Sequence, residues 1–95
     1  MPYIRLSIMK PRPGEAQRME DFMRKLTGLV LEQEGCIESY LMKPHDDSGE
    51  IARIAIYTDE QAAENSANST PVMALRSEIH LLSEPGHIER AFFSV

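Results

Sequence analysis

The first third of the chain shows two hydrophobic patterns, one typical of a strand and one typical of a helix. Residues 3–9 alternate, with Ile4, Leu6 and Ile8 on one side, which is the period of a β-strand. Prolines at 10–14 end this strand, because proline cannot donate a hydrogen bond to a sheet. From about residue 15 apolar residues recur at helical spacing, which predicts an amphipathic helix that stops at Gly35.

The remaining two thirds predict three strands and a second helical region. Residues 36–43 and 51–57 have strand-like patterns and are joined by a polar turn, so we expect a hairpin. Thr58 and Gln61 have the spacing of a capping box that starts a short helix, which Asn and Ser residues at 65–69 interrupt. Thr70, as the cap, and Pro71 begin a second helix that ends before residues 84–86. Residues 87–95 form the last expected strand.

The order β-α-β-β-α-β predicts an α+β, ferredoxin-like fold for a single domain of residues 1–95. Right-handed crossovers place the first and third strands in the middle of an antiparallel sheet, with the helices on one face. The pattern leaves open which face of the third strand the helices cover, because both sets are apolar: Ala52, Ile54 and Ile56, or Ile51, Ala55 and Tyr57. A sheet that is apolar on both faces needs a second cover. We therefore expect a homodimer in which two sheets meet across a two-fold axis.

Charge and composition narrow the classes of partner. The net charge is −5 and the basic residues are scattered, which argues against a nucleic-acid surface. No segment has the length and hydropathy of a signal peptide or a membrane span, so no membrane partner is expected. The single cysteine, Cys36, fits a reducing compartment and reads as a small hydrophobic residue entering a strand. A cytoplasmic protein is the expectation.

Four short motifs together resemble the antibiotic biosynthesis monooxygenase domain. They are Lys10-Pro-Arg-Pro-Gly14, Glu34-Gly-Cys36, Ile56-Tyr-Thr-Asp-Glu60 and Ser69-Thr-Pro71. The resemblance implies a dimeric α+β barrel. It also implies a monooxygenase that oxidises a small quinol-like or phenolic aromatic with molecular oxygen, without metal, flavin or other cofactor. The family commonly has Trp at the end of the third strand, where this chain has Tyr57.

Such chemistry requires a dry pocket, a proton acceptor and positive charge for developing oxyanions. Tyr57, Arg76 and His80 are the candidate catalytic residues. Arg76 and His80 are four residues apart and so share a helix face, where a neutral His can act as the base. Arg53, on the same side of its strand as Tyr57, and Asn65, in the short helix, are the candidate substrate-binding residues.

Each candidate also has a structural interpretation. Tyr57 can be a core or interface aromatic, and Arg53 can bridge to Glu38 or Glu50 across the hairpin. Arg76 and His80 can lie on a solvated helix face, and Asn65 can simply interrupt its helix. The sequence spacing shows no pair of histidines with a third ligand, so no metal site is expected.

Two other classes of function remain open at this point. One is a ligand-binding or stress-responsive dimer without turnover, and the other is an isomerase or lyase acting on a small metabolite. Haem degradation is disfavoured, because Arg76 falls near the position where haem-degrading relatives place the iron ligand, and a guanidinium cannot coordinate iron.

Overall fold

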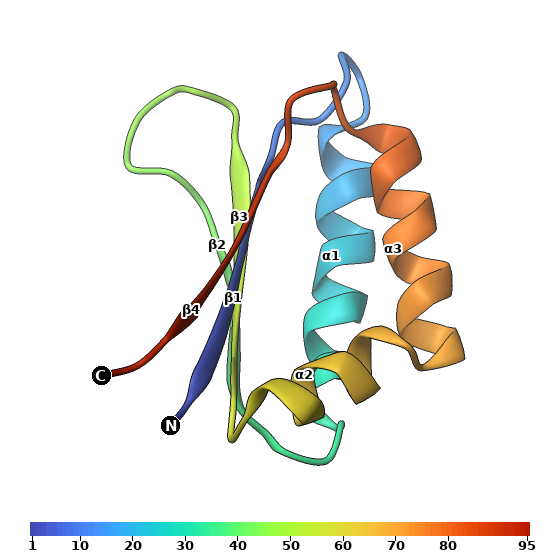
Figure 1. Ribbon diagram of the computed structural model, residues 1–95. Coiled ribbons are helices and arrows are strands. Elements are labelled where there is room, and N and C mark those ends of the chain that lie inside the picture. The colour runs from blue at the N-terminus through green and yellow to red at the C-terminus, as the bar shows by residue number, and fades with distance from the viewer.

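The computed structural model describes residues 1–95 and confirms the ferredoxin-like βαββαβ arrangement (Figure 1). Its elements are β1 (Tyr3–Met9), α1 (Ala16–Leu31), β2 (Cys36–Met42), β3 (Ile51–Tyr57), α2 (Glu60–Ala67), α3 (Thr70–Leu82) and β4 (Ile88–Phe93). No helix is both long enough and apolar enough to cross a membrane.

Helix caps and the last strand differ from the sequence expectation. The cap of α2 is Asp59, whose carboxylate accepts the Ala62 N–H at 2.8 Å, and not Thr58. Ser69 precedes α3 in an extended conformation, so Thr70 lies inside the helix. The strand expected at residues 87–95 is shorter, spanning Ile88–Phe93. The polar residues at the helix ends predict these boundaries to within one or two positions. The remaining difference arises because neighbouring hydroxyl and carboxylate groups can serve as alternative caps.

The sheet has the strand order β2-β3-β1-β4, and all neighbours are antiparallel. In the register, Tyr3 lies opposite Tyr57, and Ser7 lies between Arg53 on β3 and Glu89 on β4. Directly opposed residues point to the same face of a sheet. The register therefore places Tyr57, Arg53 and Glu89 on one face, although they belong to strands far apart in the sequence.

All three helices cover that face and leave the other face of the sheet bare (Figure 1). The core between helices and sheet holds Met19, Met23 and Val30 of α1 together with Ile79 of α3, each at most 2% exposed. The helices thus cover the Ile51, Ala55 and Tyr57 side of β3. The bare face carries the other set, Ala52, Ile54 and Ile56. The same face includes Tyr40, Ile88 and Phe92 of the edge strands, which are 44–49% exposed.

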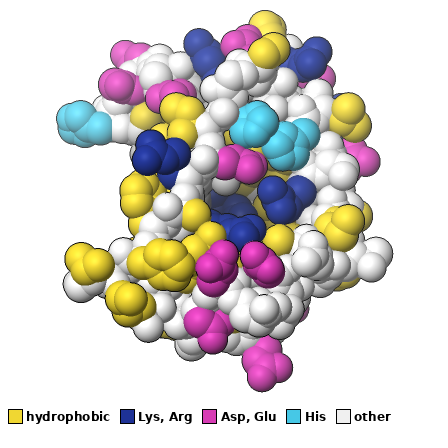
Figure 2. Space-filling model, viewed as in Figure 1, with side chains coloured by type: hydrophobic (Ala, Val, Ile, Leu, Met, Phe, Trp, Pro, Cys, Tyr) yellow, Lys and Arg dark blue, Asp and Glu magenta, His cyan; other side chains and the backbone are white.

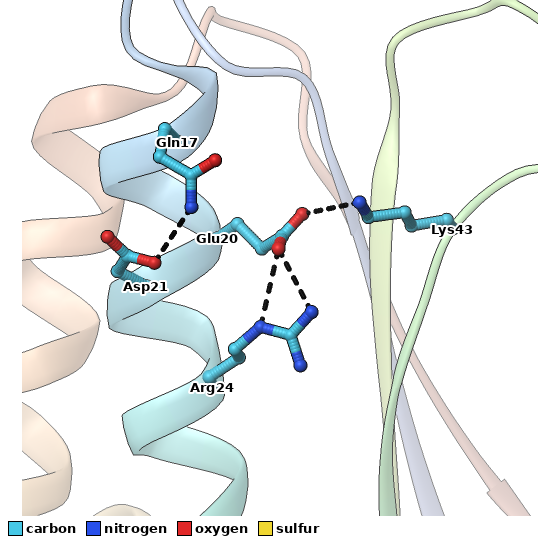
Figure 3. A network of polar contacts seen from close by, with 5 residues as sticks. All are labelled: Gln17, Glu20, Asp21, Arg24 and Lys43. Atoms are coloured by element: carbon cyan, nitrogen blue, oxygen red, sulfur yellow. Dashed lines mark hydrogen bonds and ion pairs between the residues drawn. The ribbon is translucent and has the colours of Figure 1, made fainter.

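A charged network fixes α1 to the end of β2 (Figure 3). The Glu20 carboxylate accepts two hydrogen bonds from Arg24 on α1, at 3.0 and 3.3 Å, and lies 2.8 Å from the Lys43 ammonium. Hydrogen bonds from Lys43 first, and then from Arg24, lower the pKa of Glu20. These contacts link α1 to the residue that follows β2.

Backbone hydrogen bonds pin the loop after α3 to the loop after β1. The Arg12 N–H donates to the Leu82 carbonyl, and the Glu84 N–H donates to the Lys10 carbonyl, both at 2.8 Å. The Arg12 side chain also donates to the Ser83 carbonyl at 3.2 Å. The path from α3 into β4 is therefore fixed, and with it the placement of the side chains on both elements.

Candidate functional site

A cavity of about 290 Å³ lies between the sheet and the helices α2 and α3. Figure 2 shows a hollow on this side of the molecule with Lys or Arg side chains inside it and His and acidic side chains at its rim. Its lining includes the four arginines Arg5, Arg53, Arg76 and Arg90, one carboxylate, Glu89, and the hydroxyl groups of Tyr57 and Ser66. The volume is at the small end of ligand-binding pockets, which matches a ligand of one to a few rings.

Tyr57 forms part of the cavity wall at the end of β3. Its side chain is buried, and its hydroxyl donates to the Ser66 Oγ on α2 at 3.4 Å. The long hydrogen bond joins the strand to the helix across one end of the cavity. The ring therefore presents an apolar surface, with a polar end already held in place.

Arg53 extends from the middle of β3 into the same cavity. Its Nη1 is buried, and no protein group lies within hydrogen-bonding distance of it. Burial lowers the pKa of the Arg53 guanidinium, and the nearby Arg76 acts in the same direction. The bridge to Glu38 or Glu50 that the sequence allowed is not formed. A guanidinium remains charged in proteins even so, so this corner of the cavity holds a positive charge whose buried Nη1 has no protein acceptor.

Arg76 projects from α3 toward Glu89 on β4, with Nη2 and Oε1 3.6 Å apart. The Nε2 atoms of His80 and His87 lie 3.8 and 3.9 Å from the same oxygen. His80 does not line the main cavity; it borders a narrow hollow next to it, which Arg53, Arg76 and Glu89 also line. Burial, followed by the proximity of His87, lowers the pKa of His80. A neutral imidazole is thus favoured at neutral pH.

Asn65 lies apart from the other candidates. It is exposed on α2, its amide oxygen accepts from the Gln61 side chain at 2.9 Å, and it borders a different surface depression. The residue that α2 directs into the cavity is its neighbour Ser66. The structure therefore brings Tyr57, Arg53 and Arg76 together, places His80 beside them and leaves Asn65 outside.

Sequence reasoning missed three charged residues of the cavity, Arg5, Glu89 and Arg90. Arg90 lines it from the edge strand β4, with the opposite parity to Glu89. Arg5 and Glu89 share one signal, which is parity: both are on the helix-covered side once the register of β1 with β3 and β4 is known. Only the choice of face, which the sequence left open, reveals them.

The cavity is electropositive although the protein is acidic. Arg5, Arg53, Arg76 and Arg90 line it and Glu89 is their acidic counterpart, whereas the whole chain carries a net charge of −5. Guanidinium groups bind carboxylates and other planar oxyanions through charge-assisted hydrogen bonds. The arrangement suits an aromatic ligand that has, or develops, a negatively charged oxygen.

Comparison with known proteins agrees with the architecture. The family described as antibiotic biosynthesis monooxygenase matches residues 2–78, whereas no curated protein gives a significant match. Rv0793 from Mycobacterium tuberculosis superposes with a TM-score of 0.92 at 16% identity, over 100% of this chain and 96% of that one. PA3566 from Pseudomonas aeruginosa gives a TM-score of 0.86 at 19% identity, over 99% and 94% of the two chains.

A third structure is that of SnoaB, a cofactor-independent oxygenase from Streptomyces nogalater. It has a TM-score of 0.86 and 15% identity, over 99% of this chain and 93% of that one. Identities this low show a common fold, and chemistry has to be argued from the site. The family match spans most of the sequence and the fold agrees with it, so the chain belongs to the antibiotic biosynthesis monooxygenase family.

Proposed function

We propose that the protein is a cofactor-independent monooxygenase that binds a small phenolic or quinol-like aromatic as an oxyanion beside Arg53 and Arg76. The observation that carries this proposal is the buried Nη1 of Arg53, which has no protein partner and lies in a cavity of ligand size. The family membership and the oxygenase activity of the structural relative SnoaB support the same class of reaction.

The physical reason is the cost of an unpaired buried charge. A guanidinium that loses water without gaining a partner destabilises the fold, and an anionic ligand removes that penalty. The same positive charge favours the deprotonated form of a bound phenol and so lowers its pKa. The cavity therefore selects the phenolate, the form of the substrate that is rich enough in electrons to reduce oxygen.

The proposed reaction takes all its electrons from the substrate. A hydroquinone reacts with one molecule of oxygen to give a hydroxylated quinone and one molecule of water. One oxygen atom forms the new carbon–oxygen bond and the other leaves as water, so no external reductant is required. The protein supplies desolvation, orientation and stabilisation of the negative oxygen.

The side chains would divide these tasks by position. Arg53 and Arg76 hold the oxyanion, and the Tyr57 ring supports the aromatic plane. Glu89 is the carboxylate that lines the cavity and can accept the substrate proton, and His80, 3.8 Å from it, can stabilise the proton there. Asn65, which lies outside the cavity, has no part in this scheme.

We also propose that the functional unit is a homodimer. The bare face of the sheet is apolar along its centre, from Ile4 and Leu6 on β1 to Ile54 and Ile56 on β3. A second copy is the partner that supports this proposal best, since a two-fold dimer buries the same apolar patch on both chains. Its oligomeric state in solution can be measured by light scattering coupled to size-exclusion chromatography.

Oxygen consumption tests the enzymatic proposal. Metal-free, flavin-free protein in EDTA is mixed with a panel of naphthohydroquinones and hydroxyanthrones in an oxygen-electrode cell. We expect uptake of one oxygen per product above the autoxidation rate, and a loss of uptake in Arg53→Met. Arg18→Met, which changes an exposed arginine on α1, is the matched control and keeps the wild-type rate.

No uptake by the wild-type protein with any member of the panel contradicts the oxygenase proposal. Saturable binding of the same compounds without uptake would instead establish the ligand-binding alternative. Proton exchange into a substrate without oxygen consumption would establish isomerase chemistry.

A further inference from the structure

Three side chains with metal-binding atoms meet at the rim of the cavity. His80 is in the last turn of α3, His87 is in the loop after it, and Glu89 is the second residue of β4. One ligand atom of each lies within 4.8 Å of the others. Their spacing in the sequence gives no metal motif, because the turn between α3 and β4 brings them together.

The distances are close to those of a metal site. Glu89 Oε1 is 3.8 Å from His80 Nε2 and 3.9 Å from His87 Nε2. With metal–ligand bonds of about 2.0–2.2 Å, ligand atoms around one ion lie about 3.0–3.5 Å apart. The carboxylate therefore needs to approach each imidazole by about half an ångström, and the ligand atoms of the two imidazoles, which lie within 4.8 Å of each other, by up to about 1.5 Å. Their side chains are 36–41% exposed, so rotamer adjustments can supply this movement.

The backbone is held on both sides of His87, at the end of α3 and in the strand β4. The loop after α3 is held to the loop after β1 by the hydrogen bonds of Arg12 and Glu84 described above. The rings of His80 and His87 pack edge to face, with centroids 4.7 Å apart. A site whose supporting backbone is rigid loses little entropy when an ion orders the side chains.

We propose that His80, His87 and Glu89 form a binding site for a first-row divalent transition-metal ion. Two imidazoles and one carboxylate suit Zn²⁺, Co²⁺ or Fe²⁺, whereas Mg²⁺ and Ca²⁺ prefer oxygen ligands alone. Three protein ligands leave coordination positions open for water or a small ligand. The site goes beyond the oxygenase proposal, and its own test does not require oxygenase activity. Because Glu89 and His80 also take part in the proposed proton transfer, a bound ion and that proton transfer exclude each other.

One neighbouring group opposes the ion. The Arg76 guanidinium lies 3.6 Å from the same Glu89 oxygen and repels a cation bound there. The affinity should therefore be moderate, and removal of the positive charge should increase it. Loss of a ligand side chain should weaken metal binding, whereas Arg76→Gln should tighten it.

Calorimetric titration of untagged, EDTA-treated protein with Zn²⁺ tests the site, with Mg²⁺ as the comparison ion. We expect one Zn²⁺ per chain, a raised melting temperature and no detectable Mg²⁺ binding. Affinity should fall at least about tenfold in His87→Gln and in Glu89→Gln. His45→Gln is the matched control, because His45 is exposed in the hairpin loop outside the cluster and is the remaining histidine of the chain.

Cobalt gives a second readout that does not depend on heat changes. Co²⁺ bound by nitrogen and oxygen ligands at low coordination number absorbs in the visible range, and these bands should be absent in His87→Gln. Circular dichroism spectra of the variants check that each is folded. Absence of Zn²⁺ binding to the wild type overturns the proposal. So does equal affinity in the wild type, His87→Gln and Glu89→Gln.

Discussion

Replacing Arg53 by Met should make the protein more stable and its cavity less able to bind an anionic ligand. Met keeps most of the aliphatic length of Arg and removes only the charged group. The variant thereby eliminates a buried donor without a protein partner and relieves the repulsion between Arg53 and Arg76. Both changes favour the folded state in the absence of ligand.

The expected size follows from the cost of an unsatisfied buried group. An unpaired buried donor destabilises a protein by about 1–3 kcal/mol, so unfolding of Arg53→Met should require that much more free energy. For a domain of this length, 1 kcal/mol corresponds to a shift of about 4–8 °C in melting temperature. A hydrogen bond to a charged group contributes about 1.5–3 kcal/mol, so binding of a phenolate should weaken about tenfold to a hundredfold.

Denaturation by urea, monitored by circular dichroism, measures the first quantity, and calorimetric titration with an anionic aromatic measures the second. Arg18→Met is the control in both assays, since its side chain is 63% exposed and pairs only with Glu15, the residue before its own helix. The control should change neither value by more than about 0.5 kcal/mol. A less stable Arg53→Met variant with unchanged ligand affinity would refute the reasoning, because Arg53 would then have a structural role.

Three further predictions concern the fold. Gly28→Ala should stabilise the protein by about 0.5–1 kcal/mol in a urea titration, because this residue is exposed within α1 and a methyl group meets nothing within 4 Å. Gly35→Ala should destabilise the protein in the same titration, because Gly35 has a φ of 84°. Ile54→Glu, on the bare face of the sheet, should convert a dimer into a monomer in light scattering, and an unchanged mass would exclude that face as the interface. Glu20→Gln should lower stability near neutral pH, because the folded-state pKa of Glu20 is depressed by Lys43. That difference from the wild type should disappear as pH falls through the depressed pKa, and a difference that persists in acid would argue against the ion pair.

The order of elements could be predicted because each element has its own hydrophobic period and turn or capping residues at its ends. β1 and β3 were placed correctly from alternation, and the buried stripe of α1 from helical spacing. The choice of sheet face could not be made, because both sets of side chains on β3 are apolar. The structure resolves it in favour of the face that carries Arg53 and Tyr57. That choice determines which residues can line a cavity.

The candidate site was predicted less completely than the fold. Tyr57 could be named because it ends a strand, and Arg53 because it lies on the same side of that strand. Arg76 could be named because it shares a helix face with His80. Glu89 was missed because it is on an edge strand whose register is set by β1. Its partner across the sheet is Ser7, which lies 82 positions earlier in the sequence. The cluster of His80, His87 and Glu89 was missed because the turn between α3 and β4 brings the three side chains together. Their spacing in the sequence does not resemble a metal motif.

The central claim is that the cavity binds an aromatic oxyanion through Arg53. The most direct measurement is calorimetric titration of wild-type and Arg53→Met protein with two bicyclic ligands of similar size. One is 2-hydroxy-1,4-naphthoquinone, a vinylogous acid that is an anion at neutral pH, and the other is 2-methyl-1,4-naphthoquinone, which is uncharged. We predict that the wild type prefers the anion by about tenfold or more and that Arg53→Met loses this preference while it still binds the neutral compound. Equal binding of the two ligands by the wild-type protein, or a preference that survives in Arg53→Met, would contradict the account.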